Sequence, residues 1–305
     1  MQIKERPEDF IVEEIIKLDC SGGDYIYVKL TKTDKNTVDV IEEISKKLRI
    51  PFSKIGFAGN KDKIAITIQY ISIPNIKEEK IQNLKLTDVV LEIVGRGNKP
   101  IYLGMLEGNK FKIKFETKHK IDFIENYFGP QRFSKNNHII GKLIIQNRLE
   151  EACELIKEKK INSFLKIHKN NFASALLQIR KKRLLLYIHA YQSYLWNKVV
   201  EEYLGCKFVD KRIENVEIPM ISFDIEFKDP KIKESYLRLL KEEGFNLKDF
   251  IIRSIPEITP TCSFRDLIVD VKEFQIDGEY VSFFLPKGAY ATVVLEKLET
   301  FKNSP

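Results

Sequence analysis

One aspartate of this chain lies where a carboxylate could do chemistry. Asp62 ends the run Gly56-Phe-Ala-Gly-Asn-Lys-Asp62, a turn punctuated by glycine. A short apolar approach begins at Ile55, and after the turn large apolar residues recur at every second position from 64 to 70, as in a β-strand. The pattern predicts a carboxylate held at the lip of a sheet, where it can serve as a nucleophile or as a base.

Two non-catalytic roles for Asp62 compete with this one. Aspartate is a common turn residue because its side chain bonds nearby backbone groups, and the local sequence by itself favours this role. The second is the base-recognition loop of a GTPase, but that loop requires Asn-Lys-x-Asp, and the fourth residue of the run that begins at Asn60 is Lys63. The chain also lacks the G-x-x-x-x-G-K-[ST] phosphate loop. A catalytic role therefore needs support from elsewhere in the chain.

The composition is that of a soluble globular protein. The chain has 305 residues, 43% of them hydrophobic and 31% charged, enough for one large or two ordinary domains. No apolar run approaches the roughly 20 residues that span a bilayer. The first ten residues are charged and contain no hydrophobic signal core. We therefore expect a cytoplasmic protein with no membrane partner.

Cysteines and histidines give no sign of a metal site. The four cysteines are far apart with no C-x-x-C pair, and no histidine has a histidine or carboxylate partner at helical ligand spacing. We predict ordinary buried or surface roles for all of them, and no bound metal. These residues are Cys20, Cys153, Cys206, Cys262, His119, His138, His168 and His189.

Positive charge is concentrated in one segment. The whole chain has a net charge of +7, and residues 142–190 alone hold eleven Lys and Arg against four Glu and no Asp. A local positive field favours a polyanion, because neutralised phosphates release counterions. A solvated helix face accounts for any single lysine equally well, but the concentration favours nucleic acid. The segment includes Lys157, Lys159, Lys160, Lys166, Lys169 and the run Arg180, Lys181, Lys182 and Arg183.

The first third of the chain is predicted to be mixed α/β. Strands are expected over 10–16, 25–33, 65–72, 89–94 and 110–115. A helix is expected over 37–48, where Ile41, Ile44 and Leu48 share one face. We expect Thr37 to cap this helix and Pro51 to end it.

The middle is predicted to be helical and the last part to return to β-structure. Helices are expected over 148–160, 185–204 and 230–243, with one or two strands between 213 and 227. Strands follow over 267–275 and 280–285, and 290–296 is a strand or a strand-to-helix segment. This order predicts one sheet built from both ends of the chain: a domain of residues 1–144 and 263–305, and a basic, mainly helical insertion of residues 145–262.

Four motifs in this order resemble the TruD family of tRNA pseudouridine synthases, and they span nearly the whole chain. Each alone has modest specificity, and the helical middle matches less sharply. They are Lys4-Glu-Arg-Pro-Glu-Asp-Phe10-Ile-Val-Glu-Glu14, Gly56-Phe-Ala-Gly-Asn-Lys-Asp62-Lys, Asn126-Tyr-Phe128-Gly-Pro-Gln-Arg132-Phe133 and Leu285-Pro-Lys-Gly-Ala-Tyr-Ala-Thr292.

The resemblance implies a fold and a reaction. The fold is α/β of the α+β type: a mixed, largely antiparallel sheet with flanking helices, plus the insertion domain. The reaction detaches a uracil from its sugar in tRNA, at position 13 of the D-arm, and rejoins it through carbon without cofactor or metal. Asp62 is then the catalytic residue, and residue types alone leave its role as nucleophile or base open.

The resemblance also implies a pocket for a flipped base. The amide of Asn126 would bond the uracil edge, and the ring of Phe128 would stack. Lys4, Phe10 and Glu14 match positions that approach the same pocket, and Lys4 could pair with Asp62 and keep it ionised. We expect Arg132 to brace the loop over residues 126–133, and Arg180 to Arg183 to contact RNA.

Two rival hypotheses belong to other classes. A non-catalytic RNA-binding protein could keep the fold and the basic surface, although the intact Asp62 motif argues against it. A basic DNA-binding protein is the third hypothesis, but the sequence has no recognisable helix-turn-helix or zinc module.

Overall fold

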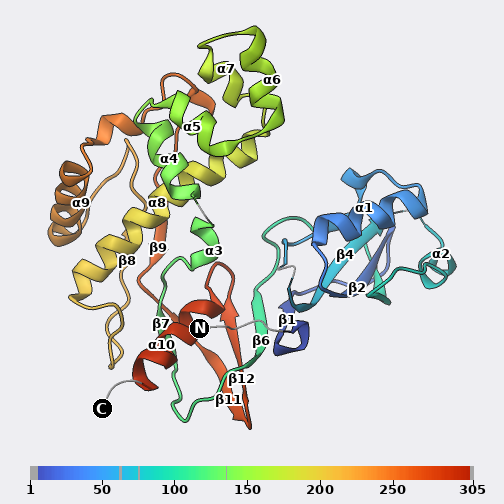
Figure 1. Ribbon diagram of the computed structural model, residues 1–305. Helices are drawn as coiled ribbons and strands as arrows, with labels where there is room; N and C mark the ends of the chain where they lie inside the picture. The colour runs from blue at the N-terminus through green and yellow to red at the C-terminus, as the bar shows by residue number, and fades with distance from the viewer. Residues whose placement is uncertain (1–5, 62–63, 75, 135, 303–305) are drawn as a thin grey trace. The chain divides into compact units, whose positions relative to one another are not determined.

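The computed structural model describes residues 6–61, 64–74, 76–134 and 136–302 and divides into two compact units. Unit 1 is Met1–Phe123, Asp270–Ala291 and Leu295–Pro305; unit 2 is Ile124–Val269 and Thr292–Val294. The domain boundaries expected from the sequence, at 144/145 and 262/263, stay predictions. Each unit is described by itself below (Figure 1).

Unit 1 holds an eight-stranded sheet made from both ends of the chain, as the sequence predicts (Figure 1). The strand order is β11-β12-β6-β1-β4-β2-β5, with β3 paired to β4. Among the described strands of this sheet, only the β1–β4 pairing is parallel, so the prediction of a mixed, largely antiparallel sheet is confirmed. The strands are β1 (Phe10–Ile15), β2 (Tyr25–Thr33), β3 (Gly56–Phe57), β4 (Ile66–Pro74), β5 (Val89–Gly97), β6 (Gly108–Lys114), β11 (Lys272–Asp277) and β12 (Tyr280–Pro286).

Helix α1 (Thr37–Leu48) closes a core against one face of this sheet. Its buried residues Val40, Ile41 and Ile44 pack with apolar side chains of β2 and β4. The expected bounds of α1 are confirmed, and the chain leaves it at Arg49 in a left-handed conformation (φ 57°). The prediction that Thr37 caps α1 is wrong: the cap is Asn36, and Thr37 is the first helical residue. A short helix α2 (Glu78–Gln82) follows β4.

The last part of the chain differs from the predicted strands in two places. The strand expected over 267–275 is divided at Val271 into β10 (Ile268–Asp270) and β11, because the two parts have different partners: β10 pairs with β7 (Phe123–Glu125), and β11 pairs with β12. The segment from 291 onward is the helix α10 (Ala291–Lys302), so a strand there is excluded. Its run of buried apolar residues at 293–295 resembles a strand, but Leu298 one turn later completes a buried helical face.

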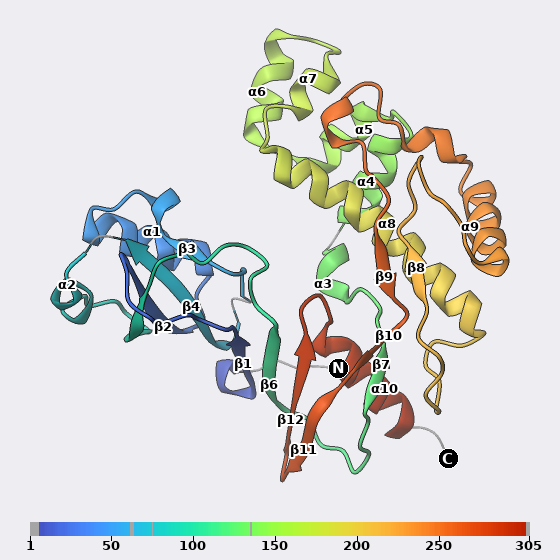
Figure 2. The same cartoon turned by 180° about the vertical axis from the view of Figure 1, so that it is seen from behind.

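Unit 2 is built around the long helix α8 (Lys181–Leu204), which Figure 2 shows beside α4. Within α8, Ile188, Tyr191, Leu195 and Val199 form an apolar stripe that is buried. Helix α8 begins one turn earlier than expected and so includes part of the basic run. The other helices are α3 (Pro130–Phe133), α4 (Asn137–Ile145), α5 (Leu149–Ile156), α6 (Lys159–Ile167), α7 (Phe172–Leu176) and α9 (Pro230–Glu242).

One further prediction for the middle is corrected. The helix expected over 148–160 is two helices, because Lys157 adopts a left-handed conformation (φ 52°) that ends α5. Where one or two strands are expected over 213–227, the structure has one, β8 (Glu217–Pro219), which pairs with β9 (Phe264–Asp266). A short strand β7 (Phe123–Glu125) pairs with β10. Among the residues that the structure describes, no helix combines the length and apolar character that a bilayer crossing requires.

Candidate active site

The segment Gly56–Lys61 leads from β3 to the predicted catalytic position in unit 1. Asp62 itself lies outside the described residues, as does Lys4. Gly56 and Phe57 pair with Ser72 and Ile71 of β4, so the segment starts on the sheet, as expected for a carboxylate at its lip. The described residues Gly56–Lys61 therefore define how the chain approaches this position.

Gly56 is required by a close approach of two backbones. A Cβ at this position would clash with the carbonyl oxygen of Ile101 and with Oγ of Ser72. Gly59 has open space where its Cβ would lie, so packing does not demand a glycine there. The glycine that begins the motif thus serves packing, and it allows the loop after β5 to lie against the segment.

Two buried polar side chains hold the end of the segment. The Thr37 hydroxyl accepts a hydrogen bond from the Lys61 amide (3.0 Å) and donates to Oε1 of Gln69 (2.8 Å). Nε2 of Gln69 in turn donates to the Gly59 carbonyl (3.5 Å). Thr37 is 2% exposed and Gln69 is fully buried. Gly59 and Lys61 are therefore anchored to α1 and β4, and the chain enters Asp62 from a fixed position.

Glu14 lies under the same segment and pairs with Lys61. Nζ of Lys61 donates to Oδ1 of Asn109 (2.6 Å) and lies 3.0 Å from Oε2 of Glu14, to which no described residue makes an aligned hydrogen bond. The Glu14 side chain is fully buried and that of Lys61 is 8% exposed. Sequence reasoning singled out Glu14 but missed Lys61 and Asn109; the adjacency of Lys61 to Asp62 is the only signal that pointed to it.

Phe10 lies on the same face of β1 as Glu14, four residues away, but in the apolar core. Its side chain is 3% exposed, and its ring meets Phe111 edge to face at 6.1 Å between centroids. Phe111 in turn contacts Phe283 of β12 at 5.5 Å. The described contacts of Phe10 thus support the sheet beneath the segment.

Asn126 and Phe128 come together in unit 2 through Arg265. The guanidinium donates to the Asn126 carbonyl (2.7 Å) and to its side-chain Oδ1 (2.5 Å), and it lies 4.0 Å from the centre of the Phe128 ring. Nδ2 of Asn126 donates to the Asp266 carbonyl (3.1 Å). An amide offers two donor hydrogens and two lone pairs, so one of each remains for another partner.

Helix α8 supports the same loop from a second side. Oδ1 of Asn197 accepts from the Phe128 amide and Nδ2 donates to the Phe128 carbonyl, both at 2.9 Å. The buried Trp196 ring meets Phe128 edge to face at 5.7 Å. Arg132 donates to Oγ of Ser193 (3.2 Å), which agrees with the bracing role expected for it. The Phe128 backbone is thereby fixed while its ring stays partly exposed.

Sequence reasoning missed Arg265, Trp196 and Asn197. Arg265 is 139 positions from Asn126 and lies in a three-residue strand with no pattern of its own. Trp196 is the single tryptophan of the chain, and with Asn197 it lies within the helix expected over 185–204, where no motif distinguishes either residue. His189 lies near Arg132 of this cluster. Burial, and next the charge of Arg132, lowers the pKa of His189, so its imidazole is neutral at pH 7.

The basic run lies at the start of α8. Arg180 is the residue before the helix, Lys181 and Lys182 are exposed in its first turn, and that turn contains no acid. Arg183 is engaged within unit 2, because it donates to the Tyr187 hydroxyl (2.9 Å) and pairs with Glu158. Arg183 therefore has partners within unit 2, whereas Lys181 and Lys182 are exposed on the first turn of the helix.

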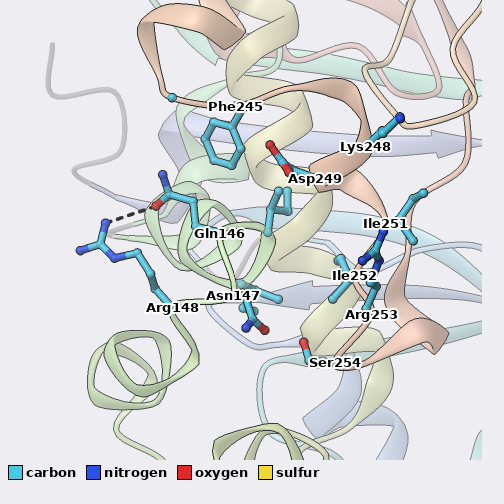
Figure 3. A pocket seen from close by; sticks show the side chains of 13 residues that line it. Gln146, Asn147, Arg148, Phe245, Lys248, Asp249, Ile251, Ile252, Arg253 and Ser254 are labelled. Carbon is cyan, nitrogen blue, oxygen red and sulfur yellow. Dashed lines mark hydrogen bonds between the residues drawn. The ribbon is translucent and has the colours of Figure 1, made fainter.

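A pocket of about 760 Å³ lies elsewhere in unit 2 and contains none of the predicted site residues (Figure 3). It is lined by the end of α4 and by residues 244–254, including Phe245, Lys248 and Arg253. Arg148 on its rim donates to Gln146 (3.2 Å) and is paired with Glu151 (2.5 Å). In the described ranges no group of three or more His, Cys, Asp or Glu side chains could hold a metal ion.

Comparison with known proteins gives one consistent family. The family model described as tRNA pseudouridine synthase D (TruD) matches residues 1–163, 154–215 and 207–298. The tRNA pseudouridine synthase D of Aquifex aeolicus is 30% identical, and the probable tRNA pseudouridine synthase D of Nanoarchaeum equitans is also 30% identical; each alignment covers 98% of both chains. These alignments extend over 376 and 373 positions, more than the 305 residues of this chain, so both relatives contain insertions.

The fold has a counterpart among crystal structures. A Methanosarcina mazei protein named as tRNA pseudouridine synthase D superposes with a TM-score of 0.71 and 22% sequence identity. The match covers 98% of this chain and 93% of that one. At this identity the likeness establishes the α/β fold.

Proposed function

Since the chain belongs to the TruD family of tRNA pseudouridine synthases, we propose that it isomerises uridine to pseudouridine at position 13 of tRNA, with Asp62 as the catalytic carboxylate. The observation that carries this proposal is the anchoring of Gly59 and Lys61 by Thr37 and Gln69 directly before Asp62. These contacts fix the backbone directly before the carboxylate, and a catalytic group needs such alignment with the reacting atoms. The family match supplies the reaction that this carboxylate performs.

The reaction is an isomerisation in which atoms balance without a co-reactant. The bond between C1′ and N1 of the uridine breaks, the uracil turns, C5 bonds to C1′, and the proton on C5 is lost while N1 gains one. Asp62 can add to C1′ as a nucleophile and leave when C5 bonds there, or remove a proton from the sugar as a base and return it in the same step. In either route its negative charge stabilises cationic character at C1′.

Access to that bond requires that the uridine leave the base stack. We propose that Asn126 and Phe128 bind the flipped uracil. The remaining donor and acceptor of the Asn126 amide match the paired acceptor and donor of a uracil edge, and Arg265 with Asp266 fixes which side of the amide carries each. The partly exposed Phe128 ring supplies an apolar stacking face.

Glu14 and Lys61 are proposed to act on Asp62 through position and charge. Because Lys61 is adjacent in sequence, its cation favours the ionised carboxylate. Glu14 and Asn109 hold that cation in place, so Glu14 is a positioning residue in this proposal. Any pairing of Lys4 with Asp62 falls on residues outside the described ranges and stays a prediction.

Loss of the Thr37 hydroxyl tests the anchoring of the turn. We expect Thr37→Val to lower kcat by about 10- to 100-fold, because a displaced catalytic group loses its alignment with the reacting atoms. Thr37→Ser keeps the hydroxyl and is the matched control, for which we expect kcat near wild type. Steady-state kinetics with unmodified tRNA, alongside thermal unfolding, checks both. Equal rates for the valine and serine variants would contradict the anchoring role.

The first turn of α8 is proposed to contact the RNA backbone. Cations at a helix N-terminus oppose the helix dipole and cost about 0.3–1 kcal/mol each, so Arg180, Lys181 and Lys182 are unfavourable there unless an anion binds. A tRNA phosphate is such an anion.

Neutralising two of these cations tests that contact. We expect Lys181→Gln with Lys182→Gln to weaken tRNA binding and to reduce the slope of log K against log salt by about 2. The control removes the same charge from the exposed Lys231 and Lys233 of α9. Binding titrations at several salt concentrations measure both. An equal loss in the two double variants would show that only net charge matters.

The proposed function is tested by incubating the purified protein with unmodified tRNA and assaying for pseudouridine. Conversion supports an enzyme. Tight binding without conversion of any RNA would favour the rival, a non-catalytic RNA-binding protein. Tighter binding of duplex DNA than of tRNA at matched salt would favour a DNA-binding protein.

A further inference from the structure

The loop between β5 and β6, residues 98–107, lies against the segment Gly56–Lys61. The Gly104 amide donates to the Ala58 carbonyl and the Ile101 amide donates to Oγ of Ser72, both at 2.8 Å. Ile101, Ala58 and Tyr27 are each 2% exposed and form one apolar cluster. One hydrogen bond to Ala58, this cluster and the close approach at Gly56 therefore join the loop to the approach to Asp62, and the bond to Ser72 joins it to β4 beside that segment. Figure 2 shows β3, where that segment begins, beside this loop.

The tip of this loop presents two large apolar side chains to solvent. Tyr102 is 65% exposed and Leu103 is 58% exposed, although Ile101 before them is buried. The tip is a tight turn: the Met105 amide bonds the Tyr102 carbonyl (3.1 Å), and Gly104 supplies the positive φ (+88°) at its third position. Tyr102 and Leu103 are thus held outward by an ordered backbone.

Cations lie at both borders of this tip. Lys99 precedes it and is exposed, and its carbonyl accepts a hydrogen bond from the Tyr27 hydroxyl (2.9 Å). Lys287, also exposed, donates from Nζ to the Gly104 carbonyl (3.3 Å). An aromatic and an aliphatic side chain between two cations fit a single-stranded nucleic acid, whose bases stack on the apolar groups while its phosphates meet the charges.

We propose that Tyr102 and Leu103 contact the nucleobases beside the target uridine in tRNA and hold the strand open while that uridine is flipped. The inference rests on the proposed function, because it places these contacts next to Asp62. A base that leaves the stack exposes the faces of its two neighbours, and apolar wedges inserted at such steps stabilise the open strand. The hydrogen bond and the close packing that attach this loop to Gly56–Lys61 hold the tip beside the residues that lead to Asp62.

The test compares Tyr102→Ala, Leu103→Ala and Tyr102→Phe with wild type, using unmodified tRNA as substrate. We expect Tyr102→Ala to lower kcat/KM by roughly 10- to 100-fold, the range of one lost base–aromatic stack, and Leu103→Ala to lower it less. Tyr102→Phe keeps the ring and should stay near wild type. Val90→Ala removes another exposed apolar side chain (55% exposed), on β5, and should change nothing. Unfolding temperatures should be equal throughout.

A second readout reports the open strand itself. With 2-aminopurine beside uridine 13, binding of Asp62→Asn protein should raise the fluorescence, and Asp62→Asn with Tyr102→Ala should lose most of that rise. The inference would be overturned if Tyr102→Ala changed neither the fluorescence rise nor kcat/KM. In that case the proposed function would still stand, provided that the wild-type protein forms pseudouridine. Light scattering gives a further check. If it shows a dimer that the Tyr102→Ala substitution dissociates, a second copy of the chain covers the tip and the inference is overturned. A wild-type protein that forms no pseudouridine would overturn the proposed function, and this inference with it.

Discussion

Asp62→Asn is expected to lower kcat by about 10⁴-fold or more, the largest effect of any single change in this chain. The amide has nearly the size of the carboxylate, but it can neither add to C1′ nor accept a proton from the sugar, and it has no charge to stabilise a cationic centre. Single-turnover kinetics with excess enzyme over unmodified tRNA measures this loss without interference from product release.

Binding should survive this change, which separates chemistry from recognition. The positions that anchor the turn, Thr37 and Gln69, are untouched, so we expect the dissociation constant for tRNA to stay within a few-fold of wild type. Asp277→Asn alters an exposed aspartate at the end of β11 and serves as the matched control. An Asp62→Asn protein that still converts tRNA at more than a hundredth of the wild-type rate would rule Asp62 out as the catalytic group.

Arg265→Ala should produce the second largest effect, a fall in kcat/KM of about 100-fold with a loss of about 2 kcal/mol in the free energy of unfolding. The substitution removes both hydrogen bonds to Asn126 and the cation over the Phe128 ring. It leaves the acceptors of Asn126, a residue only 5% exposed, without their donor. The amide is then free to turn, and the uracil edge loses its fixed donor and acceptor.

Three comparisons distinguish this role from a loss of folding. Arg265→Lys keeps the charge but not the two-pronged geometry, so we expect its activity to stay well below wild type. Arg253→Ala removes an exposed arginine of unit 2 and should be near neutral. In a double-mutant cycle on kcat/KM, Arg265→Ala and Asn126→Ala should be strongly non-additive. Additive effects would mean that Arg265 acts independently of Asn126.

Much of the fold is readable from the sequence because its signals are local. The alternating pattern of 25–33 specifies β2 to the residue, and the three-to-four spacing in 37–48 specifies α1. The errors lie where a distant partner overrides a local preference. The last strands are divided at Val271 because β10 pairs with β7 while β11 pairs with β12, and the buried face of α10 places β-branched residues in a helix.

The candidate site is less predictable for the same reason. Asp62, Asn126 and Phe128 stand out because their motifs resemble a family, whereas local chemistry alone assigns Asp62 to a turn. Thr37 has no motif, and its local pattern suggests a cap. Its contact with Lys61 spans 24 positions, and that of Arg265 with Asn126 spans 139. Such pairs are set by the tertiary fold, so a single sequence does not reveal them.

The most direct test of the proposed function is a position-resolved map of pseudouridine in tRNA from cells with and without this protein. We predict that one pseudouridine, at position 13, is absent from cells that lack the protein, returns with the wild-type gene, and does not return with Asp62→Asn. Identical maps in the presence and absence of the protein, or restoration of position 13 by Asp62→Asn, would contradict the account.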